Sequence, residues 1–591
     1  PVGELLNVFT DSIEDVADLP RQCKHGYKIR VANSAADEDD YYLQFFGNGD
    51  RDGEGVWEEC AEPGREIAIN PAKMPIQMVR NYVSNAVRFD VSQVTWDDCP
   101  VGDTTTTPEP SFVGNKITKM LFWRNRLALL SDENVNLSRP GAFFHFWPKT
   151  ATTVTPTDNI DISCSSEYPA IVYDGIQVNQ GLVLFTKNQQ FMLTTDSDVL
   201  SSQTAKINSV STYNFNYNTN PISLGTTVGF LDNAGNNTRF FEMSNVVREG
   251  APEVIEQSKI VSKLFPKDVT LIANSRENSV IFFGTKGKDE IYGYRYFASV
   301  EKRLVNAWFK WKLSGEVQHL AMLDDSLYVV VRNNGKDVLQ QFVIKLNDDT
   351  NTIVNDLGTS DTDDDITYRL HLDNATTVAH SSLTYSASDD HTTFTIPNGF
   401  NNTHGKLYAI WVPTGTDKIF QGMASHAYTI PGNKVRIPGN WKTYDPQLVT
   451  DNSTSDDVTP AGNIILGYLY DMEVKFPTIY FVTQTPNGYR SESQGSLIVH
   501  RVKFSFGPMG TYETVLDRVG KRTYTELFES TIADDYISNR VQFNPDMKAV
   551  LPIYERNTNL TLTLKSTHPS PATLYSMTWE GDYSNRFYKR V

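Results

Sequence analysis

The chain has 591 residues, with 71 Asp and Glu against 53 Lys and Arg, a net charge of -18 and 12% aromatic residues. The length predicts roughly three to four domains, and the aromatic content excludes a disordered acidic tail. The charge disfavours a protein that grips nucleic acid, because an acidic surface repels phosphate and gains nothing from counterion release.

Residues 1–109 are the most acidic part of the chain. Residues 1–60 hold 14 acids against 5 bases, and residues 1–110 together carry -12 of the total charge. Strands are expected at 27–31, 41–46 and 55–57. A short helix is expected between Asn70 and Ala86, where Pro71 suits the entry and Met78, Tyr82 and Val83 share a face. We therefore expect an acidic α+β module over 1–109, closed by a polar, Pro-bounded linker at 100–110.

Short aromatic and β-branched runs, separated by Asn, Asp and Gly, fill residues 110–346. One helix is expected at Val254–Leu264, with Pro266 ending it. Strand pairs return about every 40–50 residues, the spacing of β-propeller blades. The expected strands include Met120–Leu130, Gly181–Phe185, Gln190–Thr194, Thr226–Leu231, Arg239–Met243, Val280–Gly284, Glu290–Tyr296, Trp308–Leu313, Leu327–Arg332 and Val338–Ile344.

The rest of the chain is also predicted to be β-rich. A polar, acidic stretch at 347–365 suggests a boundary, so we divide the remainder into a divergent β-rich insertion at 347–475 and a C-terminal β domain at 476–591 that completes the core. Expected strands in the last part are Leu497–Phe506, Val541–Asn544 and Leu560–Leu564. The fold class is therefore mainly β: a β-propeller core with an N-terminal α+β module and β-sandwich-like C-terminal parts.

No part of the sequence marks an enzyme. Motifs for a nucleophile elbow, a phosphate-binding loop or a zinc protease are absent. His371, His380 and His391 match no short metal motif and are expected on surface loops. We expect no catalytic, cofactor-binding or metal-binding residues and no cofactor.

One loop has the spacing of a calcium site. Asn48-Gly49-Asp50-Arg51-Asp52-Gly53 followed by Glu59 fits ligand positions 1, 3, 5 and 12. Asn at the first position and strands on both flanks favour a solvated hairpin turn instead, because an EF-hand loop joins two helices.

Cysteine usage and hydropathy add two expectations. The four cysteines, Cys23, Cys60, Cys99 and Cys164, are too sparse for a disulfide scaffold and have no zinc spacing, so free thiols are expected. No run approaches the roughly 18 apolar residues of a membrane span, and no charged-then-apolar leader opens the chain.

One stretch of about 50 residues closely resembles the tail nozzle proteins of short-tailed bacteriophages, the tail tubular protein B family. Weaker agreement runs from about residue 20 to the end, and 347–470 diverges too far to align. The segments that carry the resemblance are Pro110–Gly114, Phe122–Leu127, Leu130–Arg139, Phe143–Pro148 and Asp158–Asp161.

The residues of this stretch have a structural interpretation of their own. Arg124 and Arg126 are expected on one face of a half-buried strand, where they pair with Asp132, Glu133 or Asp161 rather than bind a ligand. The aromatic side chains are expected to fill a core or a blade junction rather than a ligand site; they are Phe143, Phe144, Phe146 and Trp147.

The resemblance implies a homohexameric tube at the distal end of the phage tail, built around a β-propeller. Such a tube docks on an adaptor ring, helps to hold tail fibres, meets the host envelope and conducts the genome during ejection. Residues 1–109 would be platform-like and 347–475 tip-like or fibre-dock-like. Assembly is expected in the host bacterial cytoplasm. Because the family carries a further N-terminal section and the chain opens on Pro1, we expect the start to be missing.

In such a tube, the acidic charge would affect how DNA moves through the channel. Acidic walls bind phosphate weakly, so DNA would pass through the channel without being held. We expect some of the acidic module to face that channel.

Two other functions are compatible with the sequence. A tail-associated protein that binds or hydrolyses glycans would also be rich in aromatic β-structure and carboxylates. A non-viral β-propeller adhesin is disfavoured because the sequence shows no secretion signal.

Overall fold

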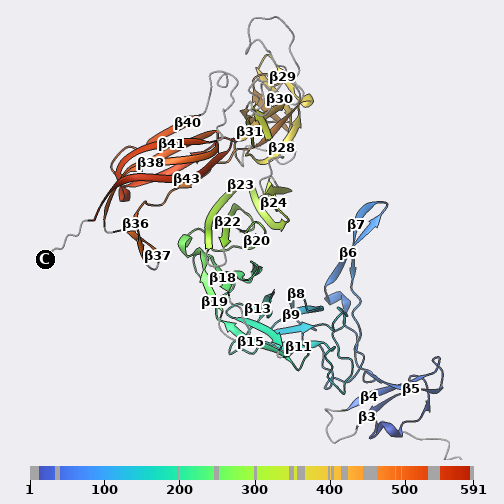
Figure 1. The fold of residues 1–591 in the computed structure, drawn as a ribbon. Helices are drawn as coiled ribbons and strands as arrows, with labels where there is room; N and C mark the ends of the chain where they lie inside the picture. Colours follow the sequence, from blue (N-terminus) through green and yellow to red (C-terminus); the bar gives the residue numbers. More distant parts are fainter. Residues whose placement is uncertain are drawn as a thin grey trace, which may run out of the picture. The chain divides into compact units, whose positions relative to one another are not determined.

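The computed structural model describes residues 12–32, 40–195, 197, 199–233, 235–244, 252–298, 303–333, 335–344, 352–355, 366–369, 371–396, 400, 405–413, 424–442, 462–485, 488–493, 495–529 and 546–585. Over these residues the chain is mainly β (Figure 1), and its helical segments are short 3-10 turns. None of the described helices is long and apolar enough to cross a membrane. The chain divides into two compact units, Pro1–Phe283 with Arg295–Trp308 and Gly284–Tyr294 with Phe309–Val591.

The first unit begins with a five-stranded sheet in the order β1-β3-β4-β5-β2. Alternation along the strands buries Ile29, Leu43 and Phe45 on one face, as expected for half-buried strands. Trp57 packs edge-on against Phe45, with ring centroids 5.2 Å apart. The strands are β1 (Ser12–Ile13), β2 (Gln22–Cys23), β3 (Lys28–Val31), β4 (Tyr41–Gly47) and β5 (Gly53–Cys60).

The helix expected between Asn70 and Ala86 is wrong. A single 3-10 turn at Pro71–Lys73 leads into an antiparallel pair, β6 (Ile76–Val83) and β7 (Ala86–Gln93). Ser84 and Asn85 both have positive φ, 50° and 62°, which matches the twist of a two-residue hairpin. The period-2 alternation of residues 76–82 therefore prevails over the helical spacing, and the N-terminal α+β module is not supported.

The long strand expected at Met120–Leu130 is a hairpin. The chain reverses at Arg124 and Asn125, whose φ angles are 46° and 59°. The two strands pair in register from Lys119 opposite Leu130 to Trp123 opposite Arg126. They belong to a four-stranded antiparallel sheet made of β8 (Ile117–Trp123), β9 (Arg126–Ser131), β10 (Asn134–Leu137) and β11 (Ile160–Ser163).

Two more four-stranded antiparallel sheets follow in chain order. Leu130 and Leu137 of the first sheet share a core with Leu184 and Leu193 of the second. A separate core joins the second sheet to the third through side chains that include Phe185. The strands are β12 (Val172–Val178), β13 (Gly181–Thr186), β14 (Gln190–Thr195) and β15 (Ala205–Ser211), then β16 (Ile222–Ser223), β17 (Val228–Asp232), β18 (Arg239–Ser244) and β19 (Glu253–Glu256).

The second expected helix, Val254–Leu264, is also wrong. Glu253–Glu256 pairs with β18, and only Gln257–Val261 turns, as a 3-10 segment. The hydroxyl of Ser258 accepts the Phe240 N–H at 3.0 Å, which fixes this short turn against the sheet.

A six-stranded sheet follows in the order β20-β21-β22-β23-β24-β25. The stretch expected as a strand at Trp308–Leu313 is part of the 21-residue β23. The strands are β20 (Leu271–Ser275), β21 (Val280–Gly284), β22 (Lys288–Ala298), β23 (Arg303–Leu323), β24 (Ser326–Asn333) and β25 (Lys336–Val343).

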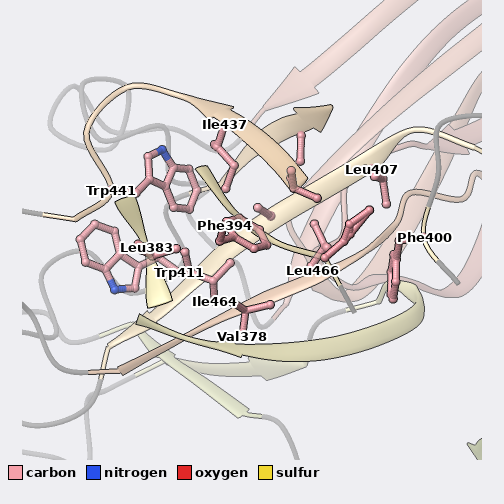
Figure 2. Packing of buried hydrophobic residues seen from close by; sticks show 14 of the residues in the cluster. Val378, Leu383, Phe394, Phe400, Leu407, Trp411, Ile437, Trp441, Ile464 and Leu466 are labelled. Carbon is pink, nitrogen blue, oxygen red and sulfur yellow. The ribbon is translucent and has the colours of Figure 1, made fainter. Parts of the chain in front are cut away.

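The second unit contains a seven-stranded sheet in the order β28-β34-β31-β32-β33-β30-β29. Its apolar side chains converge on one core, which Figure 2 shows with Phe394, Trp411 and Trp441 among them. A separate strand pair precedes it, β26 (Thr352–Asn355) with β27 (Ile366–Arg369). The sheet is made of β28 (Asp373–Ala379), β29 (Thr384–Ser386), β30 (His391–Thr395), β31 (Leu407–Pro413), β32 (Ala424–Ile430), β33 (Lys434–Pro438) and β34 (Gly462–Tyr468).

Two sheets near the C-terminus, β35-β42-β39-β40 and β41-β38-β43, share one core that includes Phe504, Leu516 and Leu562. Two sheets packed over a common core form a β-sandwich. A separate hairpin pairs β36 (Phe481–Thr485) with β37 (Gly488–Glu492). The strands of the sandwich are β35 (Met472–Lys475), β38 (Ser496–Met509), β39 (Thr511–Arg518), β40 (Tyr524–Glu529), β41 (Met547–Arg556), β42 (Leu560–Ser566) and β43 (Ala572–Ser584).

The expectation of a mainly β chain is confirmed. The strand expected at Val541–Asn544 and most of the boundary at 347–365 lie outside the described residues. Successive sheets that share cores are observed over residues 117–256, whereas the closed propeller stays a prediction.

Candidate interaction site

Arg126, in the stretch that carries the family resemblance, is only 2% exposed. Its guanidinium donates to four main-chain carbonyl oxygens. Burial lowers the pKa of Arg126, and the carboxylate of Asp158 opposes that change. Because the four carbonyls come from three separate loops, the side chain ties those loops together. The acceptors are Ser138 at 2.8 Å, Asp158 at 2.5 Å, Pro156 at 2.9 Å and Leu200 at 3.4 Å.

The expected ion pairs of Arg124 and Arg126 with nearby acids are wrong, because the chain turns between the two arginines. Arg124 is exposed and lies over the Trp123 ring at 5.4 Å. Two of the acids bond to main chain elsewhere: Glu133 accepts the Ala170 N–H at 3.0 Å, and Asp161 accepts the Ser111 N–H at 2.7 Å. The third, Asp132, occupies a turn with φ of 48°. The architectural role expected for Arg126 is supported by its carbonyl contacts.

A buried cluster, here called the aromatic junction, joins segments on both sides of residue 110. Trp96 and Phe112 both contact Phe146, with centroid distances of 5.9 and 5.1 Å. Trp147 donates from its ring N–H to the Asp97 carbonyl at 3.2 Å. The junction consists of Ile69, Val94, Trp96, Cys99, Phe112, Leu129, Phe146 and Trp147.

The core role expected for the four aromatic residues is confirmed for Phe146 and Trp147, which are buried. Phe144 lies at the rim, 37% exposed, with its ring edge-on to Trp96. Phe143 packs on Phe122, whose own ring is largely exposed. Aromatic composition therefore predicts the junction, while only tertiary structure separates its centre from its rim.

The expected linker at 100–110 is packed rather than free. Arg65 donates to the carbonyls of Gly102, Asp103 and Thr107, and Thr107 is buried. The Asp103 carboxylate accepts two backbone N–H groups of the Thr run, including that of Thr106 at 2.8 Å. A Thr-rich segment that satisfies its own backbone in this way forms a compact turn.

The aromatic junction anchors the β6–β7 hairpin, hereafter the ribbon. Ile69 precedes the ribbon, Val94 and Trp96 follow it, and all three are buried in the junction. Between them, nearly every residue of β6 and β7 is exposed. Both ends of the ribbon are thus packed in the junction, and its strands are exposed to solvent.

The pairing register gives the ribbon two different faces. One, hereafter the apolar face, consists largely of hydrophobic residues: Ile76, Met78, Tyr82, Val87, Phe89 and Val91, which are 48 to 67% exposed. The other face, hereafter the polar face, has Asn81 donating to Asp90 at 2.6 Å and Gln77 donating to Ser92 at 3.1 Å, together with two valines, Val79 and Val83, that are 43 and 48% exposed. The predicted helix hid this surface; the alternation of apolar and polar residues at 87–91 was the local signal for a strand.

The calcium-like loop is a hairpin turn between β4 and β5, as the favoured interpretation expects. Two of its would-be ligands have protein partners. Asp52 accepts the His25 N–H at 2.9 Å, and Glu59 accepts the Ala151 N–H at 2.9 Å. Within the described parts of the chain, no three His, Cys, Asp or Glu side chains lie close enough together to hold a metal ion.

One of the three histidines expected on surface loops is buried. His380 stacks on Trp411 with ring centroids 5.5 Å apart, and its Nε2 lies 2.8 Å from the Trp441 carbonyl. His391 lies in β30, where the Arg436 guanidinium approaches its Nδ1 at 2.8 Å. Aromatic stacking thus places His380 beside Trp411, a core residue labelled in Figure 2.

All four cysteines are free thiols, as expected. Cys60, Cys99 and Cys164 are buried, and Cys23 is partly exposed. Burial raises the pKa of Cys164 to about 12, with a smaller contribution from Glu133. A thiol with so high a pKa is protonated at neutral pH and chemically inert.

A family model described as bacteriophage nozzle protein matches residues 2–590. The tail tubular protein gp12 of Escherichia phage T7 is 24% identical over 596 aligned positions, which cover 99% of this chain and 69% of that protein.

Similarity to solved structures is weak. Sqt1 of Saccharomyces cerevisiae aligns with 63% of this chain and 95% of its own, at 11% identity and a TM-score of 0.24. An exo-beta-1,3-galactanase of Phanerochaete chrysosporium aligns with 60% of this chain and 93% of its own, at 10% identity and a TM-score of 0.15. Scores this low support no argument about fold or activity.

Proposed function

The chain belongs to the bacteriophage nozzle protein family, and on that premise we propose that it forms the distal nozzle of a phage tail tube. Family membership makes it a structural component of the virion's tail. The observation that carries the proposal is the match across residues 2–590, because it spans the successive sheets of the first unit and the sandwich of the second.

We propose that the sheets of residues 110–346 are blades of a β-propeller. Three of them have four antiparallel strands in chain order, which is how a blade is built. Each blade must bury its faces on its neighbours, and the cores shared between successive sheets serve that need. In this proposal the C-terminal domain, 476–591, completes the core, and residues 347–475 form a tip or fibre dock.

We further propose that six copies form a closed ring around a channel. A ring of identical subunits uses head-to-tail interfaces, in which a surface of one copy meets a different surface of the next. The platform-like residues 1–109 would meet the tail adaptor ring, and the assembled nozzle would anchor fibre proteins and reach the host envelope.

The acidic module favours DNA passage over DNA binding. Glu14, Asp15 and Asp18 are exposed and close together in sequence. If such groups line the channel, phosphates are repelled from the wall and the genome slides during ejection.

The test locates and counts the protein in virions. Tails purified from phage are labelled with an antibody raised against this chain, and the copy number per tail is measured by quantitative mass spectrometry. We expect label at the distal end and six copies per tail. Absence from the tail overturns the proposal, and a copy number other than six overturns the hexameric ring.

A further inference from the structure

The apolar face of the ribbon is too large to be an incidental surface. Met78 and Tyr82 are each 67% exposed and Phe89 is 58% exposed. The six side chains of this face present on the order of 600 Å², most of the ~800 Å² that each partner contributes to a standard protein interface. A two-stranded ribbon alone is also only marginally stable in water, so a partner on this face would stabilise it.

Charge indicates which partner fits. Arg88 and Asp90 lie on the opposite face of the ribbon and pair with each other at 2.6 Å, so the charge that a partner of the apolar face meets is that of Arg80. Arg80 belongs to the apolar face and lies over the Tyr82 ring at 5.0 Å. A basic group surrounded by apolar side chains is complementary to an acidic surface that also carries apolar side chains.

The outer face of β5 has that complementary pattern. Glu54, Val56 and Glu58 alternate along one face of the strand, and Val56 is 57% exposed. With Arg80 opposite Glu58, Val56 lies two residues further along its strand and faces Met78 or Tyr82 of the ribbon. One surface can therefore oppose the other strand to strand.

We propose that the apolar face of the ribbon docks on the outer face of β5 in a second copy of this chain. The contact is head-to-tail, because ribbon and β5 are different surfaces, and repetition of such a contact closes a ring when six equal rotations between copies complete a full turn. The inference rests on the proposed homohexamer and assigns its subunit contact to named residues. Arg80 pairs with Glu58 of the neighbouring copy, and Tyr82 and Phe89 supply the buried apolar area.

The experiment measures assembly of the full chain by analytical ultracentrifugation over a range of concentrations. The double variant Tyr82→Ser/Phe89→Ser is compared with a control on the polar face, Gln77→Ser/Asn81→Ser. Loss of two central anchors is expected to raise the concentration for half-assembly at least about tenfold, while the control assembles like the unmodified chain. Equal assembly of the apolar-face variant overturns the proposal, as does an unmodified chain that stays monomeric.

A charge exchange tests the pairing itself. Arg80→Glu should weaken assembly, and the addition of Glu58→Arg should restore it, since the reversed pair regains attraction. Failure of restoration overturns the assignment to β5. The thermal unfolding midpoint of each variant is measured to check that it folds. We expect little change in this midpoint, because the substituted side chains lie on the solvent-facing sides of their strands.

Failure of this inference is distinguishable from failure of the nozzle proposal. If the apolar-face variant still forms rings but no longer joins tails in infected cells, the ribbon docks on a different tail protein and the second-copy assignment is wrong. In that case the location of the protein in virions, measured separately, still supports the nozzle.

Discussion

Replacement of Arg126 by Met should destabilise the first unit strongly. The change removes the charge and all donors while it keeps an unbranched side chain, so four main-chain carbonyls lose their partner, three of them on buried residues. Because a missing partner leaves each acceptor desolvated and unsatisfied, we expect a loss of about 3–5 kcal/mol, typical of breaking a buried charged network.

Native-state hydrogen exchange measured by mass spectrometry is the appropriate assay, because the two units of the chain need not unfold together. Peptides covering residues 126–138 report the local free energy of opening. The matched control is Arg124→Met, two residues away, which loses only an exposed contact with Trp123 and should change that free energy by less than about 1 kcal/mol. Equal effects of the two substitutions would refute the structural role of Arg126.

Three further predictions concern separate parts of the chain. Gly293→Ala should destabilise the second unit by about 1–3 kcal/mol in urea unfolding, because the added methyl overlaps the Phe309 ring; an unchanged midpoint contradicts this packing. Alkylation at pH 8, followed by mass spectrometry, should modify Cys23 well before Cys164, because burial raises the pKa of Cys164 to about 12 and keeps that thiol protonated. Similar alkylation rates at the two thiols would contradict this prediction. Burial lowers the pKa of His568 to about 4, below its value of about 6.5 in an unfolded chain, so its stabilisation is full above pH 6.5 and is lost as the pH falls toward 4. The urea midpoint of His568→Gln should therefore fall less steeply over that range than that of the unmodified chain, and parallel curves would count against the assignment.

Regular strands were predictable from local sequence alone. β13 and β14 follow from apolar runs bounded by turn residues, and their expected ranges agree closely with the structure. The mainly β character follows from the same signal repeated along the chain.

The two expected helices failed for a shared physical reason. Over short windows, apolar residues such as Met78 and Tyr82 fit helical spacing and strand alternation at once, and Pro71 suits either a helix or a 3-10 turn. Register with a neighbouring strand decided the outcome, and in a single window that neighbour is invisible. At Arg124 and Asn125 the turn lacks glycine, so the hairpin left no strong local mark.

The candidate site was partly predictable. Composition indicated buried aromatic side chains at 143–147, and the expected structural role of Arg126 followed from its place on a half-buried strand. Its carbonyl acceptors come from loops as distant as Leu200, so only the folded chain identifies them. The partner of the apolar face of the ribbon is even harder to predict from local sequence, because in the proposal that partner belongs to another molecule.

A cryo-electron microscopy map of the intact phage tail would show both the ring and the subunit contact. We expect six copies of this chain around the axis at the distal end of the tail, with the ribbon of each copy seated on β5 of the next and acidic side chains of residues 1–109 lining the channel. A map that places the chain away from the tail axis, or in a ring of another symmetry, would contradict the nozzle. A six-fold ring whose ribbons contact only other proteins would contradict the subunit contact alone.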